Sequence, residues 1–458
     1  MRRLSNRIFM VVLAAFMVLL ASSCSGTDYL NAIPARSSAL ISIDMQKMAE
    51  NNKLADKAGV LRTMLHVDDV SDCGIDIKSK VYLFESVDGN LGLCAKVSDA
   101  GDLEKWLDKL SRQNTCTKVT ERKGFHFSVL KGSWLVGFSD EALLIMGPVV
   151  ADAQADLQRQ MTKYLAADEE AGIKSSPMFD RLDTIPTAMA MVAQAQALPE
   201  KFVAPFTLGA PKGADASQIV IAAEMNIQKG MLHISGETFS FNKGIDEALR
   251  KAAKNYRPIK GNYVKSMPDD ALAGIFMNVN GTQFLPMMQS NQGIQQLLMG
   301  INTAIDMDNI IRSVDGDMAI VLPALSDDGM KMMMAAKLSD AKWLADVGYW
   351  KNSCPKGASI GDWGKDRYVY SDGKTAFYFG VSSDMQFLSG SDELSAEYSI
   401  KPSNHPISKD IQKMVVGQKL AMVINLAKSG NDNETMSTLT GLLAPVFGNL
   451  NSIVYTLK

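Results

Sequence analysis

Two patterns of apolar and polar positions alternate along the chain. Between residues 98 and 112, apolar residues recur every three or four positions (Leu103, Leu107, Leu110), which predicts a helix capped by Ser98 or Asp99. Runs of strand-forming residues lie on either side, at 39–44, 81–85, 91–97, 125–130, 134–138 and 142–146. Neighbouring strands with helices between them predict an α+β fold, a mainly antiparallel sheet with helices packed on it.

A series of short motifs occurs twice in the same order. Residues 29–34 (YLNAIP) match 263–268 (YVKSMP), and 96–100 (KVSDA) match 337–341 (KLSDA). Further matched pairs are 75–77 with 305–307, 114–116 with 352–354, 137–139 with 380–382, Gly147 with Gly390, and His126 with Arg367 on an expected polar strand face. We therefore predict a tandem duplication, with a first α+β repeat at 24–258 and a second at 259–458.

Residues 1–23 predict an export signal. Arg2, Arg3 and Arg7 precede the apolar run 8–20, which is shorter than the roughly 20 residues of a membrane span. Small residues then lead to Cys24, the pattern at which signal peptidase II cleaves and the new terminal cysteine is lipidated. Ala21 stands where leucine is usual in this pattern. Ordinary secretion with an unmodified Cys24 is the alternative.

Lipid on Cys24 would determine where the protein resides, because acyl chains on this residue would hold it on a membrane. Ser25 follows, in place of the aspartate that favours retention at the inner membrane. We therefore expect a protein of the cell envelope that is anchored to the outer membrane by lipid. We expect it to face the periplasm, with surface exposure as the open alternative.

The order of these motifs resembles a known group of proteins. A signal ending in Cys24, YLNAIP at 29–34, a strand ending in Ile43-Asp44 and GIDI at 74–77 are similar to uncharacterised lipoprotein families of the Bacteroidota. The resemblance covers essentially the whole mature chain. It implies an envelope lipoprotein and supplies no active site, cofactor or ligand-binding residue.

Composition narrows the classes of function. The 458 residues are 47% hydrophobic and 21% charged, as in a packed globular protein. The 47 basic and 50 acidic residues give a net charge of −3, which excludes a generic nucleic-acid binder because that function needs a basic face. There are four histidines, and Ser389-Gly390-Ser391 lacks the spacing of a hydrolase nucleophile elbow. We assign no catalytic residue and no cofactor, and predict that the protein is not an enzyme.

Three groups of residues contain metal-ligand chemistry without a known ligand spacing. Met330 and Met332–Met334 offer thioethers suited to Cu(I). Residues 332–335, however, match 91–94 of the first repeat, which favours the core of a strand. Residues 306–309 begin like a calcium loop without its glycine and glutamate. The third group combines mixed donors in a loop that we interpret as solvated: His66, Asp68, Asp69, Asp72 and Cys73. We predict no metal site.

Four cysteines remain after Cys24. Cys94 falls in a predicted strand, where a small buried hydrophobic residue is expected. Cys116 and Cys354 occupy matching positions of the two repeats. A Cys116–Cys354 disulfide and a Cys73–Cys116 disulfide are both left open.

Three hypotheses for function follow. The favoured one is a non-enzymatic binding or interaction scaffold in the envelope, with an envelope protein as partner and no residue assigned to ligand binding. The 28 methionines motivate the second, a carrier or chaperone for an apolar ligand. The third is an envelope hydrolase whose site is not recognised.

Overall fold

The computed structural model describes residues 26–51, 70–198, 200–291, 295, 304–323, 325–326, 329–330, 332–426 and 450–457. The chain divides into two compact units, Met1–Thr184 (the N-terminal unit) and Ile185–Lys458 (the C-terminal unit). The predicted signal at 1–23 and Cys24 lie outside the described residues. The compact units divide at 184/185, whereas the repeats are predicted to divide at 258/259, and the repeat boundary stays a prediction.

An antiparallel sheet forms the N-terminal unit. In sheet order its strands are β1 (Ala39–Ile43), β2 (Val81–Glu85), β3 (Leu91–Lys96), β7 (Ala142–Gly147), β6 (Trp134–Phe138), β5 (Phe125–Leu130) and β4 (Thr120–Arg122). All except β4 lie at the predicted ranges. Every residue of β4 is exposed, so no apolar pattern marks this strand in the sequence.

Helices cover both faces of this sheet. α4 (Ala100–Arg112) begins at the predicted cap, because Asp99 Oδ1 accepts a hydrogen bond from the N–H of Asp102 at 2.8 Å. Leucines of α4 pack in one core with Val136 of β6. α5 (Gln154–Leu165) packs on β5, β6 and β7. Its Met161 lies against Gly137, which directly follows Val136 in β6. Since successive residues of a strand point to opposite faces, α4 and α5 lie on opposite sides of the sheet.

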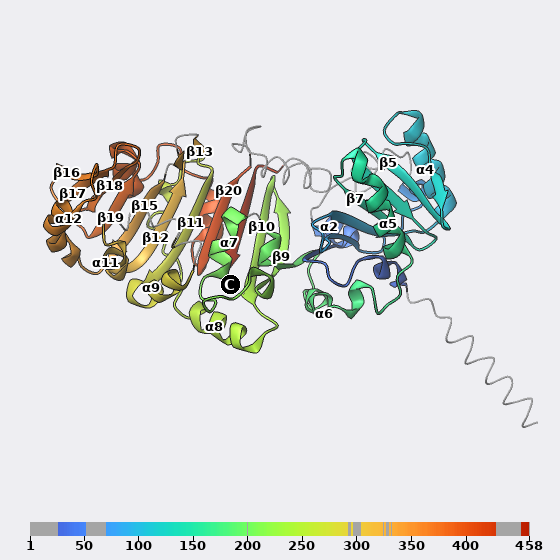
Figure 1. Ribbon diagram of the computed structural model, residues 1–458, viewed down its shortest axis with the longest axis horizontal. Helices are drawn as coiled ribbons and strands as arrows, with labels where there is room; N and C mark the ends of the chain where they lie inside the picture. The colour runs from blue at the N-terminus through green and yellow to red at the C-terminus, as the bar shows by residue number, and fades with distance from the viewer. Residues whose placement is uncertain are drawn as a thin grey trace, which may run out of the picture. The chain divides into compact units, whose positions relative to one another are not determined.

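A larger sheet forms the C-terminal unit. In sheet order its strands are β8 (Met189–Gln194), β9 (Val220–Gln228), β10 (Met231–Phe239), β21 (Ser452–Leu457), β20 (Leu420–Asn425), β11 (Ala273–Asn280), β12 (Val314–Leu322), β15 (Met333–Leu338), β19 (Gln386–Gly390), β18 (Ala376–Val381), β17 (Arg367–Ser371) and β16 (Ser359–Gly364). Only β10 and β21 pair in parallel among these strands. Figure 1 shows β11, β12 and β15 side by side, with α9 and α11 at one end of them.

The strand order β1-β2-β3-β7-β6-β5-β4 of the N-terminal unit is the order β11-β12-β15-β19-β18-β17-β16 of the C-terminal unit. The register agrees as well. Tyr82 pairs with Cys94 as Ala319 pairs with Ala335. Residues of one unit can therefore be compared position by position with residues of the other.

The register corrects two of the sequence matches. Arg367 pairs with Gly380 as Phe127 pairs with Gly137, so Arg367 corresponds to Phe127 and not to His126. Its face is the one that holds a buried phenylalanine in the N-terminal unit, so His126 and Arg367 do not share a strand face and their match is wrong. The pairing register of β19 shows likewise that Gly390 corresponds to Met146 and not to Gly147. The difference of one residue matters because it moves a side chain to the opposite face of a strand.

The predicted α+β fold is confirmed. Among the described residues, the remaining helices of the N-terminal unit are η1 (Asp28–Ala32), α2 (Met45–Asn51), η2 (Val70–Cys73), η3 (Ala151–Ala153), η4 (Ile173–Ser175) and α6 (Pro177–Asp183). Those of the C-terminal unit include α7 (Glu200–Thr207), α8 (Lys243–Ala253), α9 (Gly281–Ser290), α11 (Met307–Arg312), η8 (Lys342–Asp346), α12 (Val347–Ser353), α13 (Glu393–Ser399) and α14 (Lys409–Val415). Within the described ranges, no helix has the length and apolar character needed to traverse a bilayer.

Candidate functional site

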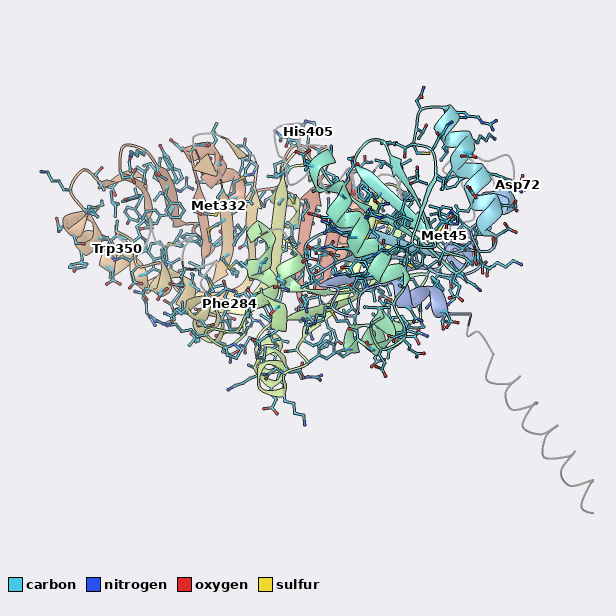
Figure 2. All side chains as sticks on the ribbon, turned by 45° about the vertical axis from the view of Figure 1, so that its right-hand side comes forward. Met45, Asp72, Phe284, Met332, Trp350 and His405 are labelled. Carbon is cyan, nitrogen blue, oxygen red and sulfur yellow. The ribbon has the colours of Figure 1, made fainter. Side chains whose placement is uncertain are left out.

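The structure describes only some of the residues singled out as metal donors. Asp72 lies in η2 (Figure 2) beside the buried Cys73, whereas His66, Asp68 and Asp69 lie outside the described residues. Asp306 caps α11, since its Oδ1 accepts a hydrogen bond from the N–H of Asn309 at 3.0 Å. Over the part of the chain that the structure describes, no group of three or more His, Cys, Asp or Glu could hold a metal ion.

The methionine cluster forms part of a strand. Met332 immediately precedes β15 (Figure 2), and Met333 and Met334 are 5% and 6% exposed within it. β15 pairs with β12 and β19, as β3 pairs with β2 and β7 in the N-terminal unit. The interpretation of Met333 and Met334 as core residues is confirmed.

The four described cysteines form no disulfide with one another. Cys94 is fully buried in β3, as predicted, and burial raises the pKa of its thiol. The Sγ atoms of Cys116 and Cys354 lie 3.3 Å from the carbonyl oxygens of Leu107 and Trp350. The proposed Cys116–Cys354 and Cys73–Cys116 bridges are therefore absent from this structure.

Two open depressions occur on the C-terminal unit. One, of about 670 Å³, is lined by Asp306, Asp308, Asp346 and Tyr349. Two of these carboxylates accept hydrogen bonds from neighbouring amides, Asp308 from Gln289 and Asp346 from Asn309, while Asp306 caps α11. All three acidic groups therefore help to hold the α11 region in place.

The second depression has a different chemistry. It measures about 440 Å³ and lies among β10, α8 and the end of β21. Three cations, Arg250, Lys254 and Lys419, and one carboxylate, Glu237, line it. Apolar surface comes from Phe239, Tyr256 and Leu457. This combination suits a ligand with an anionic group and an apolar part.

The most extended candidate site is a strip of aromatic and charged side chains over β16–β18 and α13. We call it the aromatic strip, and its members are Trp363, Arg367, Tyr378, Glu397, Tyr398 and Lys401. The rings of Trp363 and Tyr378 meet edge to face at 5.7 Å, and the Arg367 guanidinium lies 5.0 Å from the Trp363 ring centre.

Glu397 joins the two halves of the aromatic strip. Its Oε1 accepts a hydrogen bond from Arg367 Nη1 at 2.9 Å, and its Oε2 accepts one from Lys401 Nζ at 3.2 Å. The Lys401 ammonium in turn lies 5.7 Å from the Tyr398 ring centre. The hydrogen bonds from Lys401 and Arg367 lower the pKa of the Glu397 carboxyl, so Glu397 is ionised and orders both cations.

Local sequence directs these side chains to one face. The register shifts between Asp362 and Gly364, which places Trp363 at an irregularity of β16, where its Nε1 donates a hydrogen bond to the carbonyl of Tyr368 at 2.8 Å. Arg367 and Val369 share a face with Tyr378. The alternate residues of β17 and β18 point to the other face, where Phe379 packs with Trp343 and Trp350.

The helix on the strip side is too short to cover the whole face. α13 has 7 residues and packs mainly on β19, β15 and β18, whereas α5 has 12 residues and packs on β5, β6 and β7. Leu135 is 3% exposed under α5, but the corresponding Tyr378 is only half-buried. On α13, Leu394 and Tyr398 are 67% and 44% exposed. Among the described residues, the strip is thus an open sheet face edged by exposed apolar residues.

Sequence patterns placed Arg367 on a polar strand face, but they did not single out Tyr378 or predict that the two residues share a site. Both lie in strands whose apolar pattern is satisfied by the opposite face, so nothing local distinguishes them. The sequence contains one signal of the open face, which is a difference in length between corresponding segments of the two units. Pro34 bridges to Gly172 in the N-terminal unit and Pro268 bridges to Pro406 in the C-terminal unit, so these positions correspond. The chain from β19 to Pro406 is visibly shorter than that from β7 to Gly172.

Comparison with known families gives one match, which extends over both series of strands. The family model described as "Domain of unknown function (DUF4836)" matches residues 29–413. The chain belongs to this family. Membership establishes a domain of unknown function over most of the chain. This agrees with the sequence resemblance in so far as that resemblance indicated an uncharacterised family. No curated protein matches the chain.

Solved structures give weak similarities. Crystal form IV of TP0453 has a TM-score of 0.28 and 10% identity, covering 44% of this chain and 76% of that chain. Crystal form I of TP0453 has a TM-score of 0.21 and 12% identity, covering 76% of this chain and 92% of that chain.

Proposed function

We propose that this protein is an envelope lipoprotein, anchored to the outer membrane through lipid on Cys24 and facing the periplasm. The support is the basic, apolar and small-residue order of residues 1–23 ahead of Cys24. We expect the membrane to be a partner only through this anchor.

The anchor is tested by changing Cys24 to Ala. The variant should incorporate no radiolabelled palmitate and should move from the membrane fraction to the soluble fraction, because its acyl chains are lost. Cys354→Ala is the matched control, since it also removes one thiol and should leave labelling and fractionation unchanged. Membrane retention of the Cys24→Ala protein at the wild-type level would exclude the anchor.

We further propose that the protein is a non-enzymatic interaction scaffold that binds an envelope protein through the aromatic strip. The observation that supports this role is the open face left beside the short α13. Trp, Tyr and Arg are the residue types most enriched at the energetic centres of protein interfaces, and here they adjoin one another. Glu397 fixes Arg367 in place before binding, which reduces the entropy cost of association.

The scaffold role is tested by photo-cross-linking in intact cells. A benzophenone amino acid at Tyr378 should give a specific adduct with an envelope protein, and Trp363→Ala in the same chain should reduce the adduct at least tenfold. The same amino acid at Tyr349, which is 73% exposed and lies away from the strip on α12, is the control position. Equal adducts at Tyr378 and Tyr349, or no adduct at Tyr378, would contradict the proposed function.

A carrier of an amphiphilic ligand is the second candidate, favoured by the 440 Å³ depression with its three cations and apolar lining. Native mass spectrometry of the purified protein should then show a bound species of fixed mass, which Lys254→Glu with Lys419→Glu removes. An unliganded protein that also fails to take up added dodecanoate would exclude this candidate.

A further inference from the structure

We propose that the partner docks on the aromatic strip as an amphipathic helix that presents a Leu or Met stripe to Tyr378 and Trp363. This inference rests on the proposed function and specifies the chemistry of its partner. The protein contains its own template, because the corresponding face of the N-terminal unit is covered by a helix.

The template is the contact between α5 and β5–β6. Leu157 and Met161 of α5 are 3% and 0% exposed, and they are four residues apart, so they lie on one side of the helix. Beneath them, Phe127 and Leu135 are each 3% exposed. A Cβ added at Gly137 would lie 2.8 Å from the Phe127 ring and 3.0 Å from Met161 Cε, so helix and strand are in close contact.

The C-terminal unit retains only part of this cover. Arg367 lies against Gly380 as Phe127 lies against Gly137, since a Cβ added at Gly380 would lie 3.0 Å from Arg367 Cγ. α13 reaches this point through Glu397 and ends two residues later. Tyr378, Val369 and Trp363 lie further along the same face, in the position that the first half of α5 covers in the N-terminal unit. The vacant part of the face therefore has the length of a short helix.

The far end of the face supports the same conclusion. In the N-terminal unit the first residue of α5, Gln154, donates a hydrogen bond from Nε2 to the carbonyl of Gly132 in the β5–β6 turn at 2.8 Å. In the C-terminal unit, the β17–β18 turn makes its hydrogen bonds within itself. Asp372 Oδ1 accepts hydrogen bonds from the N–H groups of Lys374 and Thr375 at 2.9 and 2.7 Å. Among the described residues no helix bonds to this turn, so a helix from a partner can lie there.

The charge of the aromatic strip restricts the kind of helix that can bind to it. The strip has two cations, Arg367 and Lys401, for the single carboxylate of Glu397. A helix with acidic residues beside its apolar stripe is complementary to this balance, and such complementarity accelerates association and excludes basic helices. An extended peptide would add to a sheet edge such as that of β16, whereas Arg367 and Tyr378 lie on the face of β17 and β18, which are paired on both sides.

The test uses a fluorescein-labelled peptide of residues 150–167, which spans α5, titrated against the full-length lipidated protein in detergent. The peptide should bind saturably to the wild-type protein. Trp363→Ala and Tyr378→Ala should each weaken binding at least tenfold, and the exposed Tyr398→Ala about threefold, with circular dichroism confirming that each variant is folded. Tyr349→Ala is the matched control and should bind as the wild type does.

Two altered peptides examine the helix itself. The peptide with Leu157→Asp and Met161→Asp loses the stripe, and the peptide with Gln158→Pro keeps the stripe but cannot form the helix. Both should bind at least tenfold more weakly. The helix inference is overturned if the parent peptide does not bind, if the Gln158→Pro peptide binds equally, or if Trp363→Ala has no effect. A partner that is still cross-linked at Tyr378 would then preserve the proposed function and exclude only its helical form.

Discussion

The meanders β5–β6–β7 and β17–β18–β19 share strand order and register but differ in what covers them. In the first, α5 buries Phe127 and Leu135 and completes a core. In the second, the same two positions hold Arg367 and Tyr378, and α13 covers them only partly. The difference shows that one sheet face can be core in one unit and surface in the other when the covering helix is shorter and two side chains differ, while the opposite face is buried in both units.

The largest predicted difference between the two faces comes from placing a carboxylate on each helix. Leu157→Asp places a carboxylate in the buried α5 contact and should lower the free energy of unfolding of the N-terminal unit by about 4 kcal/mol. Leu394→Asp on α13 is the matched change, and its side chain is 67% exposed, so it should cost less than about 0.5 kcal/mol. Hydrogen exchange measured by mass spectrometry in denaturant resolves the two units. Equal costs would mean that α13 buries its face as α5 does.

A second prediction concerns a position that differs between the units. Asp317 is 2% exposed, and its oxygens accept hydrogen bonds from the N–H groups of Lys260, Gly261 and Asn262 at 2.8–2.9 Å. Asp317→Ala leaves these groups without acceptors and should destabilise the C-terminal unit by about 3 kcal/mol.

The matched substitution for Asp317→Ala is Lys80→Ala in the N-terminal unit. There the interaction with the Tyr29 hydroxyl, at 2.8 Å, uses the backbone carbonyl of residue 80 and survives the change. The lysine side chain makes only a 3.7 Å ion pair with exposed Asp183, so a loss of about 0.5 kcal/mol is expected. Denaturant midpoints that shift equally for the two variants would show that Asp317 does not anchor residues 260–262.

The smallest expected effect is the pH dependence of the aromatic strip. The pKa of Glu397 is lowered in the folded protein by hydrogen bonds from Lys401 and Arg367. Its contribution to stability is therefore present above about pH 4.3, the ordinary value for Glu, and is lost as the pH falls through the lower folded pKa. Because the pair is partly exposed, Glu397→Gln should remove less than about 1 kcal/mol at pH 7 and nothing once the carboxyl is protonated.

Denaturation midpoints at pH 7 and pH 2.5 check this pH dependence, with the exposed Glu104→Gln on α4 as control. A Glu397→Gln deficit of the same size at both pH values would show that ionisation of this carboxyl contributes nothing.

Sequence patterns predicted strands and buried helix faces well and the open face not at all. The α4 leucines and the Asp99 cap are local signals, because a helix period and a capping side chain act within a few residues. The match of His126 with Arg367 was one position out, since sequence similarity in short strands does not determine pairing register. Whether Tyr378 is covered depends on the length and path of a helix that follows it in sequence, which is tertiary information that no strand pattern contains.

The parallel pairing of β10 with β21 bears on how the C-terminal unit forms. β21 lies between β10 and β20, although more than two hundred residues separate Met231 from its partner Ser452 along the chain. Before residues 452–457 have been synthesised, β10 and β20 each present the edge that β21 later pairs. Closure of such distant strands is slow, because the entropy of a long loop must be lost before the hydrogen bonds form. The sheet between β10 and β20 is therefore continuous only after residues 452–457 have been synthesised.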